Sequence, residues 1–222
     1  FPSKYIHIGG DEVPKFRWQR CPVCQQKIKT QGLKDEQELQ SYFIKRIQKF
    51  LQSKGRVLIG WDEIMEGGAD KNAIIEVWRG QEKAKEAIAN GNSIIQTLYL
   101  DGPPASLTLQ KSFAFDPLIA GDNKKVLGAD CPLWTEWVTE YNAEYMLYPR
   151  VQAFAERLWN DKTNYPDFRK RLRRHYERMD KMQVMFGADD KNLLATQLKY
   201  LPEEKQWRLY AETGLDEIQI FY

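Results

Sequence analysis

The sequence predicts an α/β protein of the (β/α)8, TIM-barrel type, in which only the C-terminal five or so strand–helix units are present, followed by C-terminal helices. Two observations predict this fold. Short apolar runs alternate with segments of helical periodicity, which is typical of a parallel sheet covered by helices. The first 160 of the 222 residues contain about five such runs, whereas a complete barrel needs about 250 residues. We therefore expect part of a barrel that lacks roughly three strand–helix units.

Strand and helix signals alternate along the chain. The segment at 35–55 places Leu39, Phe43, Ile47, Phe50 and Leu51 on one helical face and ends at Gly55. The residues after 182 are predicted to be further helix, with a short strand at 218–222. The predicted strands are 4–8, 56–61, 73–78, 93–101 and 125–134, and the predicted helices are 35–55, 81–89, 144–159 and 166–183.

Composition excludes several classes of protein. The chain is 42% hydrophobic and 13% aromatic, as expected for a globular domain, and its net charge of +2 argues against a dedicated nucleic-acid surface. Apolar residues at helical spacing within the basic run at 168–182 indicate a solvated helix face. No apolar stretch approaches the roughly 20 residues of a membrane span.

Cys21 and Cys24 form a single CPVC motif, which predicts a turn or a local disulfide rather than a zinc site, so we expect no metal.

The segment HIGGDEV, at 7–13, places two adjacent carboxylates directly after an apolar run. Gly9 and Gly10 precede Asp11 and Glu12. Glycine allows backbone conformations and close approaches that side chains forbid, so such a pair often marks a strand end beside a ligand. A turn with a solvated acidic pair is the alternative for this motif taken alone.

Aromatic and acidic side chains follow each of the later predicted strands. They are Trp61-Asp62-Glu63, Trp78-Arg79, Tyr99 with Asp101, and Trp134 with Glu136. The carboxyl ends of barrel strands together form the active site, and aromatic faces flanked by carboxylates suit a sugar. The sequence contains neither a phosphate-binding glycine loop nor a GxSxG nucleophile motif.

The motifs HIGGDEV, GWDEI, VW, YLD and LWTE, in this order, closely resemble the family 20 glycoside hydrolases, the β-N-acetylhexosaminidases. The resemblance runs from about residue 4 to 160 and implies a cofactor-independent enzyme that releases terminal non-reducing β-linked N-acetylhexosamine, GlcNAc or GalNAc. It implies that residues 1–160 are the C-terminal part of a catalytic barrel. We expect residues 161–222 to form a helical extension packed on that barrel.

The resemblance also implies a substrate-assisted retaining mechanism, a noted exception among retaining glycosidases. Glu12 would be the general acid and then the general base. The nucleophile would be the substrate's own 2-acetamido oxygen, and Asp11 would hold the acetamido N–H.

Six further residues are implied in substrate binding. Tyr99 would donate a hydrogen bond to the acetamido oxygen, Trp61 and Trp78 would wall the acetamido pocket, and Trp134 would lie under the sugar ring. Asp101 and Glu136 would bind its hydroxyls. For Asp62 and Glu63, a structural hydrogen bond or a solvated loop is an equal alternative to substrate contact.

The sequence departs from the family pattern in two places. Members often supply a tryptophan after YLD, but none lies between Trp78 and Trp134, so that Leu107, Phe113 or Phe115 fills the gap or the pocket is more open. The arginine that the first barrel strand supplies in the family has no counterpart. Arg79 and Arg56 are poorly placed to replace it.

Two alternatives stay open at this point. The chain is either a non-catalytic or incomplete carbohydrate-binding half-barrel that needs its missing N-terminal part, or a two-carboxylate glycosidase with Asp101 or Glu136 as nucleophile. We expect N-acetylhexosamine-terminated glycans as partners, and a homodimer or association with the missing part, because an open half-barrel exposes sheet edges. A periplasmic, cell-surface or secreted location is expected from the bacterial look of the sequence.

Overall fold

The computed structural model describes residues 1–102, 107–119, 123–187, 194–201 and 204–213. They fall into two compact units, each described here by itself. Unit 1 comprises Phe1–Thr97 and Pro117–Asp130, and unit 2 comprises the described residues of Leu98–Asp116 and Cys131–Tyr222. The predicted boundary at residue 160 stays a prediction.

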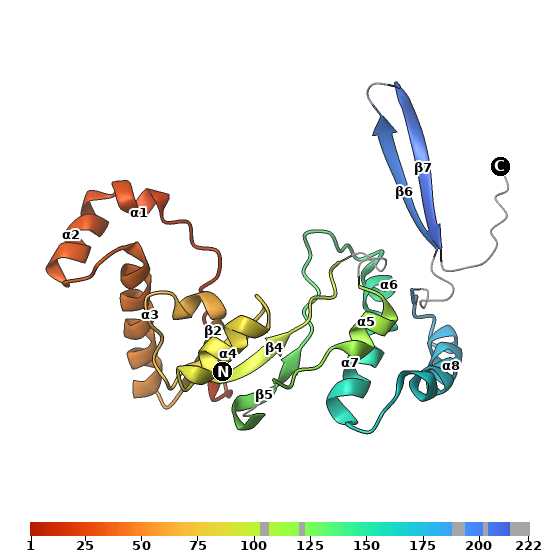
Figure 1. The fold of residues 1–222 in the computed structure, drawn as a ribbon, viewed down its shortest axis with the longest axis horizontal. Coiled ribbons are helices and arrows are strands. Elements are labelled where there is room, and N and C mark those ends of the chain that lie inside the picture. The colour runs from red at the N-terminus through yellow and green to blue at the C-terminus, as the bar shows by residue number, and fades with distance from the viewer. Residues whose placement is uncertain (103–106, 120–122, 188–193, 202–203, 214–222) are drawn as a thin grey trace. The chain divides into compact units, whose positions relative to one another are not determined.

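Unit 1 is built on a five-stranded parallel sheet in the order β1-β2-β3-β4-β5 (Figure 1). Strands that follow one another in the chain are neighbours in the sheet, as consecutive strands of a (β/α)8 barrel are. The strands are β1 (Tyr5–His7), β2 (Val57–Trp61), β3 (Ile74–Val77), β4 (Ser93–Thr97) and β5 (Val126–Asp130). The helical segments are α1 (Phe16–Arg20), α2 (Pro22–Thr30), α3 (Glu36–Ser53), η1 (Asp62–Met65), α4 (Gln81–Ala89) and η2 (Asn123–Lys125).

The core of unit 1 packs helices against the sheet. Leu58, Ile75 and Ile94 of three neighbouring strands are almost completely buried, together with Ala84 and Ala87 of α4. The small alanines let α4 approach the strands closely, and burying each large aliphatic side chain contributes about 1.5–3 kcal/mol. This packing holds the carboxyl ends of the strands in place.

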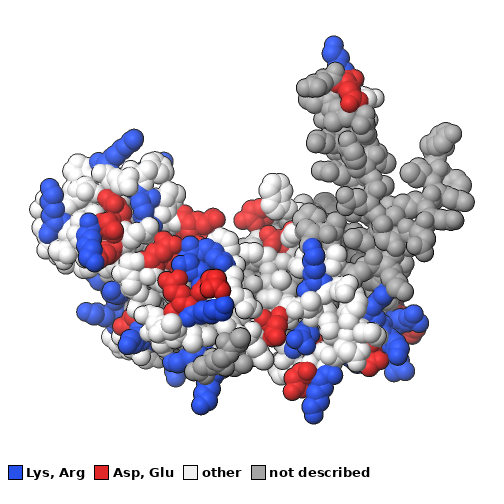
Figure 2. Space-filling model, viewed as in Figure 1, with Lys and Arg blue, Asp and Glu red and all other residues white. Residues whose placement is uncertain are grey.

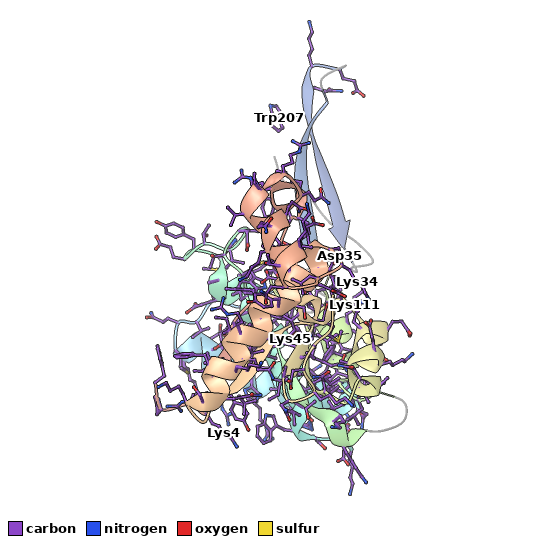
Figure 3. All side chains as sticks on the ribbon, turned by 90° about the vertical axis from the view of Figure 1, so that its left-hand side faces the viewer. Lys4, Lys34, Asp35, Lys45, Lys111 and Trp207 are labelled. Carbon is purple, nitrogen blue, oxygen red and sulfur yellow. The ribbon has the colours of Figure 1, made fainter. Side chains whose placement is uncertain are left out.

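Helix α3 is capped as its sequence predicts but buries a different face. Asp35 accepts a hydrogen bond of 2.9 Å from the Glu38 N–H, and Figure 3 shows Asp35 beside Lys34 at the start of the helix. Phe43 and Phe50 are exposed, so the expected apolar face is wrong at these two positions. The buried side chains are Gln40, Ser41, Ile44 and Gln48. Gln40 and Ser41 are buried because their side chains donate hydrogen bonds to the carbonyls of Gly10 and Gly68, which lie in loops.

Unit 2 contains four helices among its described residues, namely α5 (Leu109–Ala114), α6 (Ala143–Leu147), α7 (Arg150–Trp159) and α8 (Tyr165–Lys181). Their shared core includes Leu109, Phe113, Phe168 and Leu172. The single helix predicted at 144–159 is two helices, α6 and α7. Pro149 separates the two helices. Proline has no N–H to donate and disfavours helical backbone in the residue before it, so the first helix ends there.

The helix predicted after residue 182 is wrong over Leu194–Thr213. There β6 (Leu194–Leu201) and β7 (Gln206–Thr213) form an antiparallel hairpin in which Leu201 pairs with Gln206. The strand period, in which polar and apolar residues alternate, is present in QLKY at 197–200 and in QWRL at 206–209. The strand predicted at 218–222 lies outside the described residues.

Charge and cysteine placement agree with the composition. Figure 2 shows acidic and basic side chains interspersed over the described surface of the face it presents, rather than separated by sign. In the part of the chain that the structure describes, no helix is long and apolar enough to cross a bilayer. Cys21 is the N-cap residue of α2 and Cys24 lies in the first turn of that helix, both as free thiols, so the structure has a helix start here and neither the expected loop turn nor the disulfide.

Candidate functional site

The loop after β1, which carries the acidic pair, depends on two glycines with positive φ. Gly9 and Gly10 have φ of 72° and 105°, and Glu12 also has a positive φ, 45°. A Cβ on Gly10 would lie 2.5 Å from a methyl carbon of Ile64, so a side chain there would collide with the core. Asp11 and Glu12 are consequently exposed at the carboxyl end of the sheet.

Trp61 ends the neighbouring strand and is fixed beside this loop. Its backbone N–H donates a hydrogen bond of 3.1 Å to the Gly9 carbonyl, and the residue is only 8% exposed. The imidazole of His7 lies edge-on to the indole, with ring centroids 5.0 Å apart. The acidic loop and the first predicted tryptophan are therefore brought together.

Trp78 is held by the two carboxylates that follow Trp61. Its indole N–H donates to Glu63 over 3.0 Å, and its backbone N–H donates to the buried Asp62 over 3.0 Å. The backbone N–H of Arg79 also donates to Asp62, over 3.1 Å. The structural alternative for Asp62 and Glu63 is thus confirmed, since both position Trp78.

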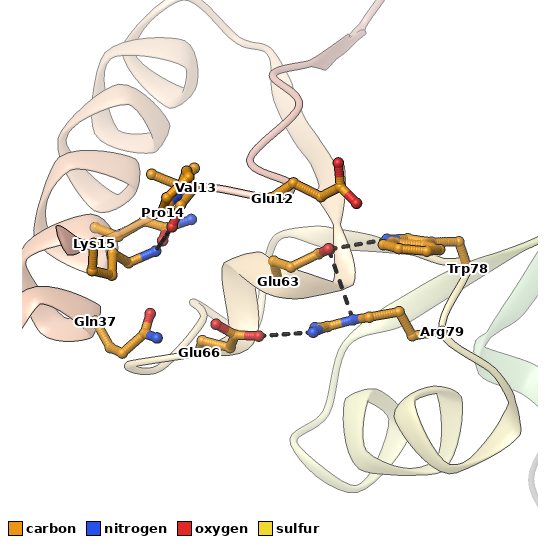
Figure 4. A pocket seen from close by; sticks show the side chains of 10 residues that line it. Glu12, Val13, Pro14, Lys15, Gln37, Glu63, Glu66, Trp78 and Arg79 are labelled. Carbon is orange, nitrogen blue, oxygen red and sulfur yellow. Dashed lines mark hydrogen bonds and ion pairs between the residues drawn. The ribbon is translucent and has the colours of Figure 1, made fainter. Parts of the chain in front are cut away.

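Arg79 completes this network through its guanidinium. It hydrogen-bonds to Asp62, donates to Glu66 over 2.8 Å, and lies 3.9 Å from Glu63 (Figure 4). Burial lowers the pKa of Arg79, but hydrogen bonds to Glu66 and Asp62 outweigh burial, so that its pKa is raised. Arg79 therefore acts here as the counter-ion of three carboxylates.

A second polar network lies inside the sheet, and sequence reasoning missed it. His7 Nε2 lies 3.3 Å from a carboxylate oxygen of Glu76, while His7 Nδ1 accepts a hydrogen bond of 3.1 Å from the Gly9 N–H. The Thr97 hydroxyl donates to Asp130 over 2.8 Å, and Glu76 and Asp130 are hydrogen-bonded to each other. The network therefore links the acidic loop to β3, β4 and β5.

The two acids of this network take opposite protonation states. Burial first, and then Glu76, raises the pKa of Asp130 to about 7. Burial also raises the pKa of Glu76, but hydrogen bonds from His7 and Asp130 outweigh it and lower that pKa. Near neutral pH, Asp130 can hold a proton and donate it in a hydrogen bond to ionised Glu76. The signal in the sequence for this network is a carboxylate within each of two apolar strands, Glu76 in β3 and Asp130 in β5.

A cavity of about 420 Å³ opens beside Glu12 (Figure 4). It is lined by Glu12–Lys15, by Gln37 and Gln40 of α3, and by Glu63, Glu66, Trp78 and Arg79. Burial lowers the pKa of Lys15, although Glu66 and Glu63 oppose the shift. The cavity joins the candidate acid to the Trp78 network and is mixed in charge.

Unit 2 holds the four other predicted site residues. The rings of Tyr99 and Trp134 meet edge-on with centroids 6.5 Å apart. The Leu100 N–H donates to the Pro132 carbonyl over 3.0 Å, which ties the segment of Tyr99 and Asp101 to that of Trp134. Glu136 is exposed two residues further on.

Buried Arg150 supports the segment after β4. Its guanidinium donates to the carbonyls of Met146, Leu100, Gly102 and Leu107. Burial lowers its pKa to about 10, although the charge of Asp101 opposes the shift. Arg150 was missed because three of its four partners are backbone oxygens more than 40 residues away in sequence.

The aromatic residues proposed to fill the missing tryptophan position pack against other rings of unit 2. Phe113 is buried in α5 and stacks on Phe168 at 5.3 Å, so that expectation is wrong for Phe113. Phe115 packs against Phe154, with ring centroids 5.4 Å apart. Leu107 is half-buried, and its carbonyl accepts from Arg150. Across the described ranges, no three His, Cys, Asp or Glu side chains are grouped as metal ligands.

Comparisons with known proteins agree with these motifs. The family described as "Glycosyl hydrolase family 20, catalytic domain" matches residues 1–162. A β-hexosaminidase of Porphyromonas gingivalis is 41% identical over 203 residues, covering 81% of this chain and 26% of the relative. The β-hexosaminidase subunit beta of Homo sapiens is 31% identical over 193 residues, covering 81% of this chain and 35% of the relative.

Solved structures give the same result. An exo-β-N-acetylglucosaminidase of Vibrio harveyi superposes with a TM-score of 0.77 at 28% identity, covering 85% of this chain and 33% of that one. A β-N-acetylhexosaminidase of Bacteroides fragilis gives a TM-score of 0.74 at 27% identity, with coverages of 85% and 43%. The chain thus spans about a quarter to two fifths of the length of these relatives.

Proposed function

The chain belongs to glycosyl hydrolase family 20, and from this premise we propose that it contributes to an enzyme that removes terminal non-reducing β-linked N-acetylhexosamine from glycans. The proposal concerns the full-length protein, meaning these residues with any that flank them in the native polypeptide. The observation that carries it is the arrangement of Asp11 and Glu12 at a strand end, beside Trp61 and Trp78.

In this proposal Glu12 protonates the leaving oxygen and then activates a water molecule as general base. Asp11 accepts the acetamido N–H of the substrate and stabilises the positive charge that develops on that group. Trp61 and Trp78 enclose the acetamido group, and Trp78 is held for this purpose by Glu63.

Substrate assistance is favoured over a protein nucleophile by the placement of the acids. An ordinary retaining glycosidase needs two carboxylates about 5–5.5 Å apart that flank the scissile bond. Asp11 and Glu12 are consecutive residues of one loop, an arrangement poorly suited to act on opposite faces of one sugar ring. In this proposal the substrate's acetamido oxygen supplies the nucleophile, and Tyr99 orients it.

We also propose sugar-binding roles for three residues of unit 2. Trp134 provides a ring face for the sugar, and Asp101 and Glu136 accept hydrogen bonds from its hydroxyl groups. Two observations favour these roles. Trp134 contacts Tyr99 edge-on, and Arg150 donates a hydrogen bond to the Leu100 carbonyl in the segment after β4.

We also propose that this chain associates, either as a homodimer or with an N-terminal part of the barrel, and that the enzyme is periplasmic, cell-surface or secreted. Among the described strands, β1 pairs with β2 alone and β5 with β4 alone, so each has an open edge. Phe43 and Phe50 are exposed on α3 and Leu127 on β5. Light scattering that finds a clean monomer at micromolar concentration would contradict the association.

The test of the activity is release of nitrophenol from 4-nitrophenyl N-acetyl-β-D-glucosaminide by the full-length protein, beside its Glu12→Gln variant. We expect release that depends on Glu12, since glutamine cannot donate the proton. A folded protein without release, or with equal release in the variant, contradicts the proposal.

The second candidate is a non-catalytic carbohydrate-binding role, which the open sheet edges of the 222-residue chain favour. Binding of an N-acetylglucosamine thiazoline, a mimic of the cyclised intermediate, separates the two. The catalytic proposal expects affinity that is lost in Asp11→Ala, whereas a sugar platform without a complete site would not distinguish that variant.

A further inference from the structure

We propose that unit 1 carries a second binding site, for a tetrahedral oxyanion such as sulfate or phosphate, between α3 and the loop that follows η1. The site is a cavity of about 270 Å³ that shares no lining residue with the cavity beside Glu12. The inference does not depend on the proposed hydrolase activity, because none of the residues assigned to that activity contributes to this cavity.

The side chains around this cavity supply positive charge. Lys45, Arg46 and Lys49 of α3 line it, with Lys45 about midway along the helix (Figure 3), and Asp70 is the one acid among the described lining residues. None of the three cations forms an ion pair with a described residue. Lys45 and Lys49 are four residues apart on one helical face, where like charges repel. An anion bound between them would relieve that repulsion.

A buried amide beside these cations also needs an acceptor. Gln48 is only 3% exposed and lines the cavity, and its side-chain nitrogen has no hydrogen-bond partner among the described residues. A buried donor without a partner is costly, so an apolar side chain would be the more stable choice at this position of α3. An oxyanion in the cavity would supply the acceptor that this nitrogen lacks.

The number of donor groups distinguishes between classes of anion. Lys45, Arg46, Gln48 and Lys49 present four donor groups to a cavity smaller than the roughly 300–1,000 Å³ of pockets for drug-sized ligands. A carboxylate has two oxygens, whereas sulfate and phosphate have four. The guanidinium of Arg46 lies over the Tyr42 ring, 5.9 Å from its centroid, which favours one orientation of this donor. The cavity therefore matches a small tetrahedral oxyanion.

Both walls of the cavity are fixed in the absence of a ligand. The Ser41 hydroxyl donates to the Gly68 carbonyl over 2.7 Å, which ties α3 to the loop after η1 one turn before Lys45. In the same loop, the amide of buried Asn92 donates to the Asp70 carbonyl over 2.8 Å. The donors are consequently held close together by the fold, and binding an anion requires little reordering of the backbone.

The experiment measures binding of radiolabelled sulfate and phosphate to the full-length protein by equilibrium dialysis, at an ionic strength held constant with sodium chloride. We expect saturable binding that depends on this cavity. The double variant Lys45→Gln/Lys49→Gln should bind about tenfold more weakly, because it loses two charged donors. Gln48→Leu should also bind about tenfold more weakly, although it leaves every charge in place.

The matched control is Lys4→Gln/Lys29→Gln, which removes the same charge from two exposed lysines outside the cavity and should bind as the parent does. Gln48→Leu also separates binding from folding. Without an oxyanion it should be at least as stable in urea as the parent, because the unpaired amide is no longer buried.

Galactose 6-sulfate, which carries the anion as an ester, distinguishes two sources of the ligand. Competition by the ester and by inorganic sulfate supports a site that accepts sulfated sugars, whereas competition by inorganic sulfate alone supports a site for the free ion. Neutral galactose should not compete. Equal affinity in the parent and both cavity variants, an equal loss in the control, or no saturable binding would overturn the proposal.

Discussion

Replacing Asp130 by Asn should remove a pH dependence of stability between pH 4.5 and 7. In the folded protein the pKa of Asp130 is raised from 3.8 to about 7 by burial and by Glu76. Between these values the folded state binds more protons than the unfolded state, so the free energy of unfolding of the parent falls as pH rises. Glu76, whose pKa is lowered from 4.5, changes its contribution below that pH, so the interval isolates Asp130.

The magnitude follows from the size of the shift. About three pH units at 1.36 kcal/mol per unit give about 4 kcal/mol as an upper bound. Asp130 is only half-buried, and screening by solvent reduces this to about 1–2 kcal/mol. Asparagine keeps an oxygen for the Thr97 hydroxyl and an N–H for Glu76, so it imitates the protonated acid.

The assay is urea unfolding of the chain at pH 4.5, 5.5, 6.3 and 7, for the parent, Asp130→Asn and the exposed control Asp161→Asn. The parent should lose about 1–2 kcal/mol across the series relative to Asp130→Asn. A constant difference between the two proteins would refute the shared proton. The control should follow the parent.

Three further predictions rest on individual contacts. Glu12→Gln should abolish nitrophenol release while keeping affinity for N-acetylglucosamine, as measured by calorimetry, and hydrolysis at the parent rate would remove the acid assignment. Gly67→Ala should lower the free energy of unfolding in urea by more than about 2 kcal/mol, because the new Cβ would collide with the Gln37 carbonyl. Gly55→Ala, where a Cβ would meet no atom within 4 Å, should lower it by about 1 kcal/mol. Equal losses in the two variants would contradict the contact. Arg150→Met should lower the free energy of unfolding by about 3 kcal/mol, because buried carbonyls lose their hydrogen-bond donor. It should also speed hydrogen exchange of the Leu100 amide, and an unchanged exchange rate would count against this role of Arg150.

Much of unit 1 could be predicted because its signals are local. Each of the five predicted strands corresponds to a strand of the sheet, and their order in the sheet is their order in the chain. Two strands end earlier than predicted, at Thr97 and Asp130 rather than at 101 and 134, and the residues that follow each of them belong to unit 2. The glycine pair beside Asp11 also needs no long-range information.

The missed features depend on partners far apart in sequence. Asp130 meets Glu76 across 54 positions, and Arg150 meets Leu100 across 50. Neither pairing leaves a periodic pattern in the sequence. The β6–β7 hairpin is different, because two short alternating segments, at 197–200 and 206–209, were present in the sequence and the prediction of helix did not take them into account.

The buried polar face of α3 has a functional explanation. An ordinary amphipathic helix would bury Phe43 and Phe50, yet α3 buries Gln40 and Ser41 instead. Gln40 bonds to the loop that carries Glu12, and Ser41 bonds to the loop that follows η1, on which the Trp78 network rests. One rigid helix therefore sets the positions of the acid and the second tryptophan. A substitution that shifts the start of α3 should alter catalysis, because both groups would move with the helix.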